Sequence, residues 1–254
     1  MTQKQHLHRF SRTELLIGTD GLNTLRDSSV TLFGLGGVGS YAAEALCRAG
    51  VGRITIVDFD DVCISNINRQ LHALDNTIGR PKTQVMAERL RLINPQAEII
   101  PYREFYSADT AALLLSGSCD YVLDAIDHFT SKVHLIKTCQ NRGIPIISSM
   151  GAAMKRDPTL VRVDDISRTS NCRMARSVRK LLRKEGIESG VTVVYSTEEF
   201  SGIPLSEAQE GASITLPDEQ GEGRRRMVLG SISYLPAIFG FTMAGIVINA
   251  LIKR

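Results

Sequence analysis

The sequence contains no C-x-x-C pair, no apolar run of signal-peptide length near its first residue, and little net charge. Without C-x-x-C pairs, a zinc site built on paired thiolates is excluded, and the five scattered cysteines are typical of buried, reduced thiols. We therefore expect a cytoplasmic protein that is not exported. Because the net charge is only +3, a nucleic-acid partner has to be met by a local basic patch and not by the whole surface.

Apolar strand patterns alternate with helical patterns along this chain of 254 residues. Helical segments such as KTQVMAERLRLI separate the expected strands, which lie at 30–33, 53–57, 98–100, 121–125 and 144–148. This alternation predicts an α/β fold with a doubly wound, mainly parallel, Rossmann-like sheet. We predict one domain over residues 1–254, with a core at about 9–165 and a C-terminal α/β extension over 166–254 that has little core of its own.

An uncharged segment of 25 residues occupies 228–252 and raises the question of a membrane span. If Pro236 begins the helix, the helix is about 24 Å long at ~1.5 Å per residue, which is less than the ~30 Å of a bilayer core. We therefore favour a buried or subunit-interface helix over a membrane span. Gly240 and Ala244, four residues apart, permit close helix packing.

The segment GLGGVG satisfies the pattern G-x-G-x-x-G between an expected strand and an expected helix, with glycines at Gly34, Gly36 and Gly39. Such glycines let the backbone approach a phosphate at a helix N-terminus, and Asp58, at the end of the next strand, is placed to accept ribose hydroxyls. Gly37 removes a further side chain where a phosphate or substrate comes close. Alone, this pattern predicts an adenosine nucleotide such as NAD.

Polar and charged residues that a dinucleotide does not require follow the same strands. Asn66 and Arg69 lie in SNINRQ after the second strand, Lys82 opens the next helix, and Asp127 follows the fourth strand in DAIDHF. Each has an ordinary explanation as a solvated charge or a helix cap. In an open parallel sheet, however, they gather at the carboxyl ends of the strands, where a triphosphate needs cations and a metal ion. Together they favour adenylyl transfer over hydride transfer.

The segments GLGGVG, DFDDVCISNINRQ, GRPK and DAIDHF resemble the adenylating domain of the ubiquitin-activating-enzyme-like family, over about 9–165. That family includes the activators of the molybdopterin and thiamine sulfur carriers. The resemblance implies ATP and Mg²⁺ as cofactors, with Asp58 on the ribose and Asp127 on the magnesium. It also implies that Asn66, Arg69 and Lys82 contact the triphosphate.

The segment RFSRTELL carries Arg12, which matches the family arginine that reaches into the partner subunit's site. The resemblance therefore implies a homodimer with Arg12 acting in trans. Sulfur-carrier activators in this family usually bind structural zinc through two C-x-x-C pairs. We expect no structural zinc here, because the chain has no such pair.

Three further segments, SSMGAAMKRDPT, VVYSTE and GSISYLPAIFG, are similar to the tRNA threonylcarbamoyladenosine dehydratases, which extends the resemblance to nearly the whole chain. It implies ATP-dependent adenylation of the threonylcarbamoyl carboxylate next to the tRNA anticodon, then ring closure with release of AMP and pyrophosphate. The chain departs from that pattern at SNCRMA, where an Asp-Pro pair is expected. We interpret Cys172, in this segment, as an incidental thiol, because closure within the substrate needs no thioester.

Residues 166–184 contain seven basic and no acidic residues. An apolar stripe at helical spacing directs most of these cations away from the core. Lys and Arg contacts to phosphates supply most sequence-independent nucleic-acid affinity. The RNA-binding candidates are therefore Arg173, Arg176, Arg179, Lys180 and Arg183, with GRRRM at 223–227 as an extension of the same patch.

Three other functions are open to a chain with these motifs. An adenylyltransferase that activates the C-terminus of a sulfur-carrier or ubiquitin-like protein shares the nucleotide site, although the basic helix and the lack of zinc cysteines argue against it. An NAD-dependent oxidoreductase explains the glycines and Asp58 but gives no role to Arg69, Lys82 and Asp127. A nucleotide-sensing or scaffold protein would bind ATP without turning it over.

Overall fold

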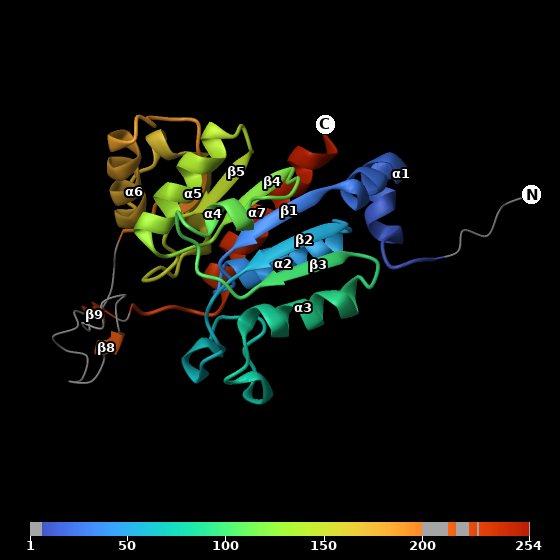
Figure 1. The fold of residues 1–254 in the computed structure, drawn as a ribbon, viewed down its shortest axis with the longest axis horizontal. Helices are drawn as coiled ribbons and strands as arrows, with labels where there is room; N and C mark the ends of the chain where they lie inside the picture. The colour runs from blue at the N-terminus through green and yellow to red at the C-terminus, as the bar shows by residue number, and fades with distance from the viewer. Residues whose placement is uncertain (1–6, 200–212, 217–223, 228, 254) are drawn as a thin grey trace, which may run out of the picture.

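A seven-stranded sheet forms the centre of the computed structural model, which describes residues 7–199, 213–216, 224–227 and 229–253 (Figure 1). The strand order is β3-β2-β1-β4-β5-β7-β6, and all neighbours are parallel except β6, which runs antiparallel to β7. The bounds are β1 Ser29–Phe33, β2 Arg53–Val57, β3 Glu98–Tyr102, β4 Tyr121–Asp124, β5 Ile146–Ser149, β6 Val161–Asp165 and β7 Thr192–Ser196. The predicted doubly wound, mainly parallel sheet is confirmed.

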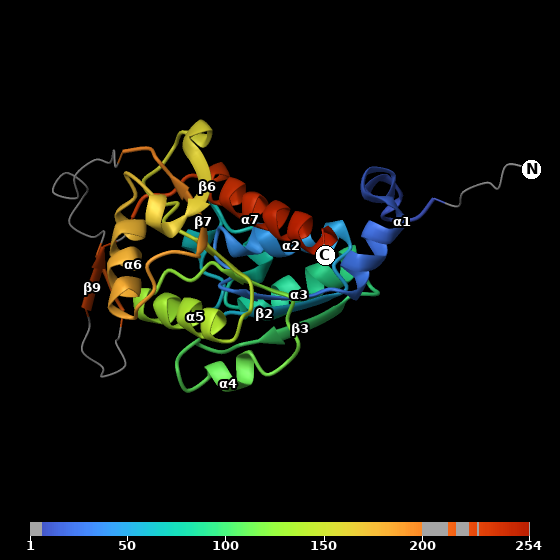
Figure 2. The same cartoon turned by 90° about the horizontal axis from the view of Figure 1, so that it is seen from above.

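Helices cover both faces of this sheet (Figure 2). One face carries α2 Gly39–Ala49, α3 Lys82–Ile93 and α7 Tyr234–Ile252, and the other carries α4 Ala111–Leu114, α5 Phe129–Asn141 and α6 Arg173–Lys184. The fully buried strand β1 places Leu32 in one apolar cluster and its neighbour Phe33 in the other, because successive side chains of a strand point to opposite faces. The carboxyl edge of the sheet therefore sits on a firm two-sided core.

Helix α1, Ser11–Asp27, leads directly into β1 and so lies at the amino edge of the sheet, beside the end of α7 (Figure 1). Short 3-10 helices connect the larger elements, at Ile64–Asn66, Asp75–Thr77, Pro158–Leu160 and Ile166–Arg168. Different segments therefore lie at the two edges of the sheet. The amino edge holds α1, and the carboxyl edge holds the loops after the parallel strands.

The tail helix α7 begins at Tyr234, so the prediction that Pro236 starts it was wrong. Pro236 is the third helical residue, where a backbone N–H has no intrahelical partner to lose. At 19 residues, α7 is about 28 Å long by its rise per residue, and it is the one helix in the described part of the chain long and apolar enough to span a membrane. Half of the residues in its most apolar stretch are nevertheless buried. A Cβ on Gly240 would overlap the carbonyl oxygen of Val38, so α7 packs tightly against the start of α2.

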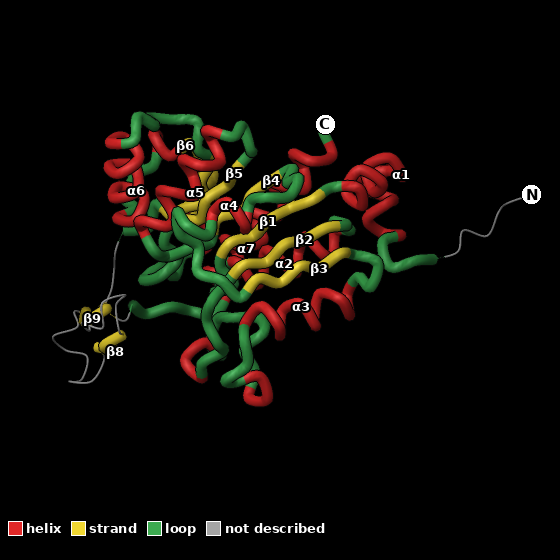
Figure 3. Tube along the Cα trace, viewed as in Figure 1, coloured by secondary structure: helices red, strands yellow, loops and turns green. Residues whose placement is uncertain are grey.

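The segment after Asp165 contributes to the central sheet and to a separate hairpin. Strand β7 pairs with β5, whereas β8 Ser213–Leu216 and β9 Arg224–Met227 form a two-stranded antiparallel sheet (Figure 3). Residues 201–223 form a polar, glycine-containing segment of the sequence, which predicts a loop. The structure has a strand at 213–216 within it, and its remaining residues lie outside the described part. The division into a core and an extension stays a prediction.

Candidate active site

The glycine loop joins β1 to α2 at the carboxyl edge, where the sheet order reverses between β1 and β4. Gly34 has a φ of 90°, and a Cβ there would lie 2.7 Å from the carbonyl oxygen of Ala125. A Cβ on Gly39 would overlap the Gly34 carbonyl oxygen, so these two glycines permit the turn and the close packing of α2. Gly36 faces space that no described residue occupies, which leaves its backbone open to a phosphate. Gly37 instead faces Arg69 and Pro236.

Asp58 follows β2 and lies against this loop, with only 8% of the residue exposed. One carboxylate oxygen accepts a hydrogen bond from the Leu35 backbone N–H at 2.6 Å, and the other accepts from the Asp60 N–H at 2.9 Å. Burial raises the pKa of Asp58, and the charge of Lys82 opposes that rise. The carboxylate is thus fixed beside the glycine loop, where the Rossmann arrangement places a ribose.

Lys82 opens α3 as predicted, and its side chain is almost fully buried between two carboxylates. Its Nζ donates to Asp60 Oδ2 at 2.7 Å and lies 3.9 Å from Asp58 Oδ1. Asp60 was not among the predicted site residues, although it lies in the acidic segment DFDD. These carboxylates hold the ammonium at the carboxyl edge, so phosphate groups that bind there have to share it with Asp60.

The SNINRQ segment folds into a 3-10 turn after β2. Asn66 is buried, and its Oδ1 accepts from the Cys63 N–H at 3.0 Å, so this side chain shapes the turn from within. The Arg69 guanidinium donates to the Ser65 carbonyl at 2.8 Å and to Asn68 Oδ1 at 2.9 Å. Burial lowers the pKa of Arg69, yet the group remains cationic at any physiological pH. The structure therefore brings Arg69 to the glycine loop, against Gly37.

Asp127 lies exposed in the loop between β4 and α5, across the same edge. His128 is the N-cap of α5 and accepts from the Ser131 N–H, so Asp127 is not the helix cap. Among the described residues, no cluster of three or more His, Cys, Asp or Glu side chains could hold a metal ion. A single carboxylate nevertheless fits Mg²⁺, which usually takes one or two carboxylates and completes its shell with phosphate oxygens and water.

A buried ion pair that was not predicted from the sequence supports the Asp127 loop. Lys132 and Asp124 have fully buried side chains, with Nζ 2.7 Å from Asp124 Oδ2 and 3.1 Å from Ser148 Oγ. Asp124 Oδ1 accepts from the Ile126 N–H at 3.0 Å, one residue before Asp127. The pair therefore ties β4, α5 and β5 together and fixes the path of the loop. Its signal was the first carboxylate of DAIDHF with a lysine eight residues later.

Arg12 is exposed on α1, at the amino edge of the sheet. Figure 1 shows α1 at the opposite end of the strands from the start of α2, where the glycine loop lies. The fold does not bring Arg12 to the nucleotide site of its own chain. This placement is compatible with the expected action in trans.

The basic helix α6 begins at Arg173, with Cys172 as its N-cap. The Cys172 thiol is buried, and its sulfur accepts from the Ala175 N–H at 3.4 Å, so the thiol takes the capping role expected of an aspartate at this entry. Cys172 was interpreted as an incidental thiol, and the structure adds a capping role at the start of α6. Arg179 is half-buried and bonded to the preceding turn, which distinguishes it from the other RNA-binding candidates.

His72 follows SNINRQ closely and is 1% exposed, and neither ring nitrogen has a hydrogen-bond partner among the described residues. Burial, aided by the charges of Lys82 and Arg89, lowers the pKa of His72 to about 4. Its unfolded pKa is near 6.5, so the unfolded chain binds the proton more strongly, and the stability from neutral His72 is present above that pH. Between pH 7 and about pH 4.5 we expect His72 to cost on the order of 2–3 kcal/mol of unfolding free energy.

Urea unfolding of the wild-type protein and of His72→Phe at both pH values measures this cost. The variant should lose less stability than the wild type between the two pH values, because its ring does not titrate. Equal losses in the two proteins would contradict the assignment to His72.

The fold and these side chains define a class: a Rossmann-like protein whose carboxyl edge carries a glycine loop, a fixed carboxylate and two cations. The model of the ThiF family matches residues 10–254, and the chain belongs to that family. A tRNA threonylcarbamoyladenosine dehydratase of Bacillus subtilis (strain 168) is 47% identical, over 97% of this chain and 96% of that protein. The protein of the same name from Escherichia coli (strain K12) is 37% identical, over 92% and 89%.

A crystal structure of the E. coli tRNA N6-threonylcarbamoyladenosine dehydratase in complex with ATP matches with a TM-score of 0.83 at 34% sequence identity. The match covers 96% of this chain and 94% of that chain. The resemblance to the adenylating family, and within it to the dehydratases, is therefore confirmed.

Proposed function

We propose that this protein is an ATP-dependent tRNA threonylcarbamoyladenosine dehydratase. The observation that carries the proposal is the near full-length likeness to dehydratases, together with a carboxyl edge where Asp58, Arg69 and Lys82 meet the glycine loop. The substrate is the threonylcarbamoyl group on the adenosine next to the tRNA anticodon. The products are the cyclised nucleoside, AMP and pyrophosphate.

The first step activates the carboxylate, which is a poor acylating agent because oxide is a poor leaving group. A carboxylate oxygen attacks the α-phosphorus of ATP, a new P–O bond forms, and pyrophosphate leaves. Asp58 holds the ribose, while Arg69 and Lys82 offset charge on the departing phosphates, with Asn66 shaping the turn that carries Arg69. Asp127 would hold Mg²⁺, which supplies further neutralisation of phosphate charge when bound.

The second step closes the ring. A nucleophile of the same threonylcarbamoyl group attacks the activated carbonyl carbon, and AMP leaves with the former carboxylate oxygen. The nucleoside thereby loses the elements of one water molecule. Because the nucleophile is tethered to the carbonyl, proximity replaces an enzyme-bound intermediate, and buried Cys172 needs no catalytic role.

The proposal includes a homodimer in which Arg12 of each chain completes the site of the other. It is supported by the position of Arg12 at the far edge from its own glycine loop. A cytoplasmic location, where tRNA and ATP are found and free thiols persist, suits a chain whose five cysteines are all unpaired.

Incubation with ATP, Mg²⁺ and tRNA that carries threonylcarbamoyladenosine, followed by digestion and mass spectrometry of the nucleosides, tests the function. We expect the modified adenosine to lose the mass of one water, with AMP formed in equal amount. Omission of ATP is the control. An unchanged nucleoside would refute the proposal and direct the search to adenylation of a sulfur-carrier protein, the second candidate.

A further inference from the structure

We propose that the exposed stripe of α6 formed by Arg173, Arg176, Lys180, Arg183 and Lys184 is the surface that holds the tRNA phosphates, and that Arg179 is an internal strut with no part in RNA contact. This inference rests on the proposed function and deepens it. It divides the basic residues of α6 into two groups with different, measurable roles.

The stripe follows from helix geometry. At 3.6 residues per turn, the five stripe residues fall within an arc of roughly 100° and extend over about 16 Å. The opposite side of α6 is buried in the core through Ala175, Val178 and Leu182. Among the described residues, no hydrogen bond or ion pair engages the side chains of Arg176, Lys180, Arg183 and Lys184. Four cations are thus presented to solvent without a counter-charge from the described part of the fold.

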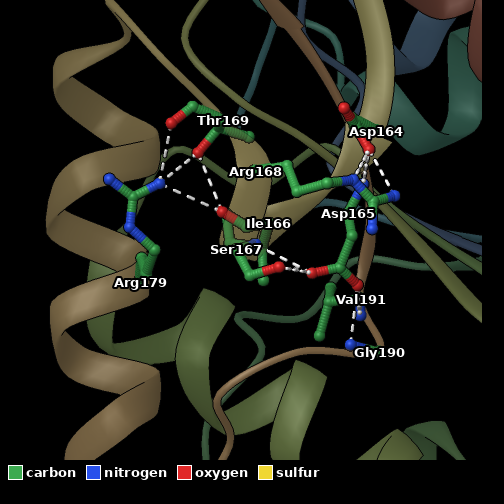
Figure 4. Close-up of polar contacts among 9 residues, drawn as sticks. All are labelled: Asp164, Asp165, Ile166, Ser167, Arg168, Thr169, Arg179, Gly190 and Val191. Atoms are coloured by element: carbon green, nitrogen blue, oxygen red, sulfur yellow. Dashed lines mark hydrogen bonds and ion pairs between the residues drawn. The ribbon is translucent and has the colours of Figure 1, made fainter.

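Arg179 projects from the edge of this helix toward the preceding turn (Figure 4). Its Nη1 donates to the Ile166 carbonyl at 3.1 Å and to the Thr169 carbonyl at 3.0 Å, with a short bond to Thr169 Oγ1. Because this guanidinium donates hydrogen bonds to two backbone carbonyls, it fixes α6 against the turn 166–169. Arg168, in that turn, is itself paired with Asp164, so this cation also has a partner within the fold.

Asp165 anchors the other side of the same turn. Its carboxylate accepts from the Ser167 N–H at 2.8 Å and from the Gly190 and Val191 N–H groups at 2.6 and 3.0 Å (Figure 4). Strand β6, the turn and the start of β7 are therefore joined through one side chain. Arg179 connects α6 to this frame, so the direction of the stripe is set by the central sheet.

The stripe begins at the carboxyl edge that holds the nucleotide site. Asn171 Nδ2 donates to the Thr197 carbonyl just after β7, and a Cβ on Gly151, just after β5, would lie 3.5 Å from Met174. Figures 1 and 2 place α6 at the end of the molecule toward which the parallel strands run. A tRNA whose modified base enters this edge therefore has its neighbouring phosphates beside α6.

RNA fits this surface better than an anionic membrane does. A basic amphipathic helix binds a membrane by inserting its apolar side, but Val178 and Leu182 are 0% exposed within the core. The surface that remains is cationic and rich in arginine, which binds phosphates as a planar donor fork. Its partner is consequently a polyanion that needs no apolar insertion.

Binding of tRNA carrying threonylcarbamoyladenosine, measured over a range of KCl concentrations, tests the inference. The double variant Arg176→Gln/Arg183→Gln should lower the magnitude of the slope of log K against log[KCl] by about 1.4–1.8, from ~0.7–0.9 per phosphate contact. The matched control is Arg26→Gln/Arg53→Gln, which removes two exposed charges at the amino edge and should leave the slope unchanged. Arg179→Gln should keep the wild-type slope but lower the melting temperature.

An unchanged slope in the double variant, or a change of equal size in the control, would overturn the inference. A lower slope in Arg179→Gln would overturn the division between strut and stripe. Wild-type binding to anionic phospholipid vesicles, lost in the double variant, with no binding to tRNA, would overturn RNA as the partner. If the wild type dehydrates the nucleoside while the double variant binds tRNA normally, the inference fails and the proposed function stands. If the wild type leaves the nucleoside unchanged while the double variant shows the lower slope, the proposed function fails and the RNA-binding surface stands.

Discussion

Arg12→Ala and Asp127→Ala should each lower the rate of cyclisation by roughly 100- to 1000-fold, and a mixture of the two variants should recover about a quarter of the wild-type rate. In the proposed mechanism, each substitution removes charge stabilisation from the transition state. In a mixed dimer, however, one site receives intact Arg12 from one chain and intact Asp127 from the other. Random exchange of subunits makes half of the dimers mixed, and each of these has one complete site. Both residues are exposed, so neither change disturbs the core.

The cyclisation rate is measured by nucleoside mass spectrometry before and after subunit exchange. The paired control is Arg26→Ala with Asp109→Ala, exposed charges outside the site, which should each retain the wild-type rate. A mixture of Arg12→Ala and Asp127→Ala no more active than its components would contradict action in trans. Strong activity of Arg12→Ala alone would remove Arg12 from the site.

Lys132→Met should lower the free energy of unfolding by about 3–5 kcal/mol, because it leaves the Asp124 carboxylate buried without its cation. Water cannot replace the lost cation, since both side chains are 0% exposed, and the hydrogen bonds from Ser148 Oγ and the Ile126 N–H supply no counter-charge. The loop to Asp127 depends on Asp124 through the Ile126 N–H, so the remaining folded protein should also bind ATP and Mg²⁺ less tightly. Chemical denaturation gives the stability, and calorimetry of ATP with Mg²⁺ gives the affinity.

Lys137→Met is a matched control on the same helix. Lys137 pairs with Glu185 at 2.6 Å, but both side chains are more than 40% exposed, so the loss should be no more than about 1 kcal/mol. Replacing both partners, in Lys132→Met/Asp124→Leu, should recover part of the stability lost in Lys132→Met. Equal losses of unfolding free energy for Lys132→Met and Lys137→Met would show that burial does not determine how much such a pair contributes to stability.

The strand pattern and the glycine loop were predictable because they depend on local features. The expected strands agree with β1 to β5 to within two residues, since buried parallel strands are short apolar runs bounded by turns. The approach of Arg69 and Lys82 to one edge also followed from strand ends alone. A rule about where strands end needs no knowledge of side-chain contacts.

The missed features depend on contacts between distant segments. Lys132 sits in a helical pattern where a lysine normally lies in solvent, and only the position of Asp124 across the fold makes its burial possible. Arg179 has the same residue type and nearly the same spacing as its neighbours, yet the turn at 166–169 draws it inward. For α7, a proline inside the first turn hid the true start of the helix.

The packing of α7 on α2 sets an order of events during protein synthesis. The ribosome makes α7 about 190 residues after α2, which takes ~10 to 40 seconds at typical elongation rates. Throughout that interval the part of α2 that packs against α7 has no cover, and Pro236 is not yet present beside Gly37. The nucleotide loop is encoded early, but its contact with Pro236 can form only after the tail helix has been made. We therefore expect a newly made chain to bind ATP tightly only after its tail helix has docked beside Gly37.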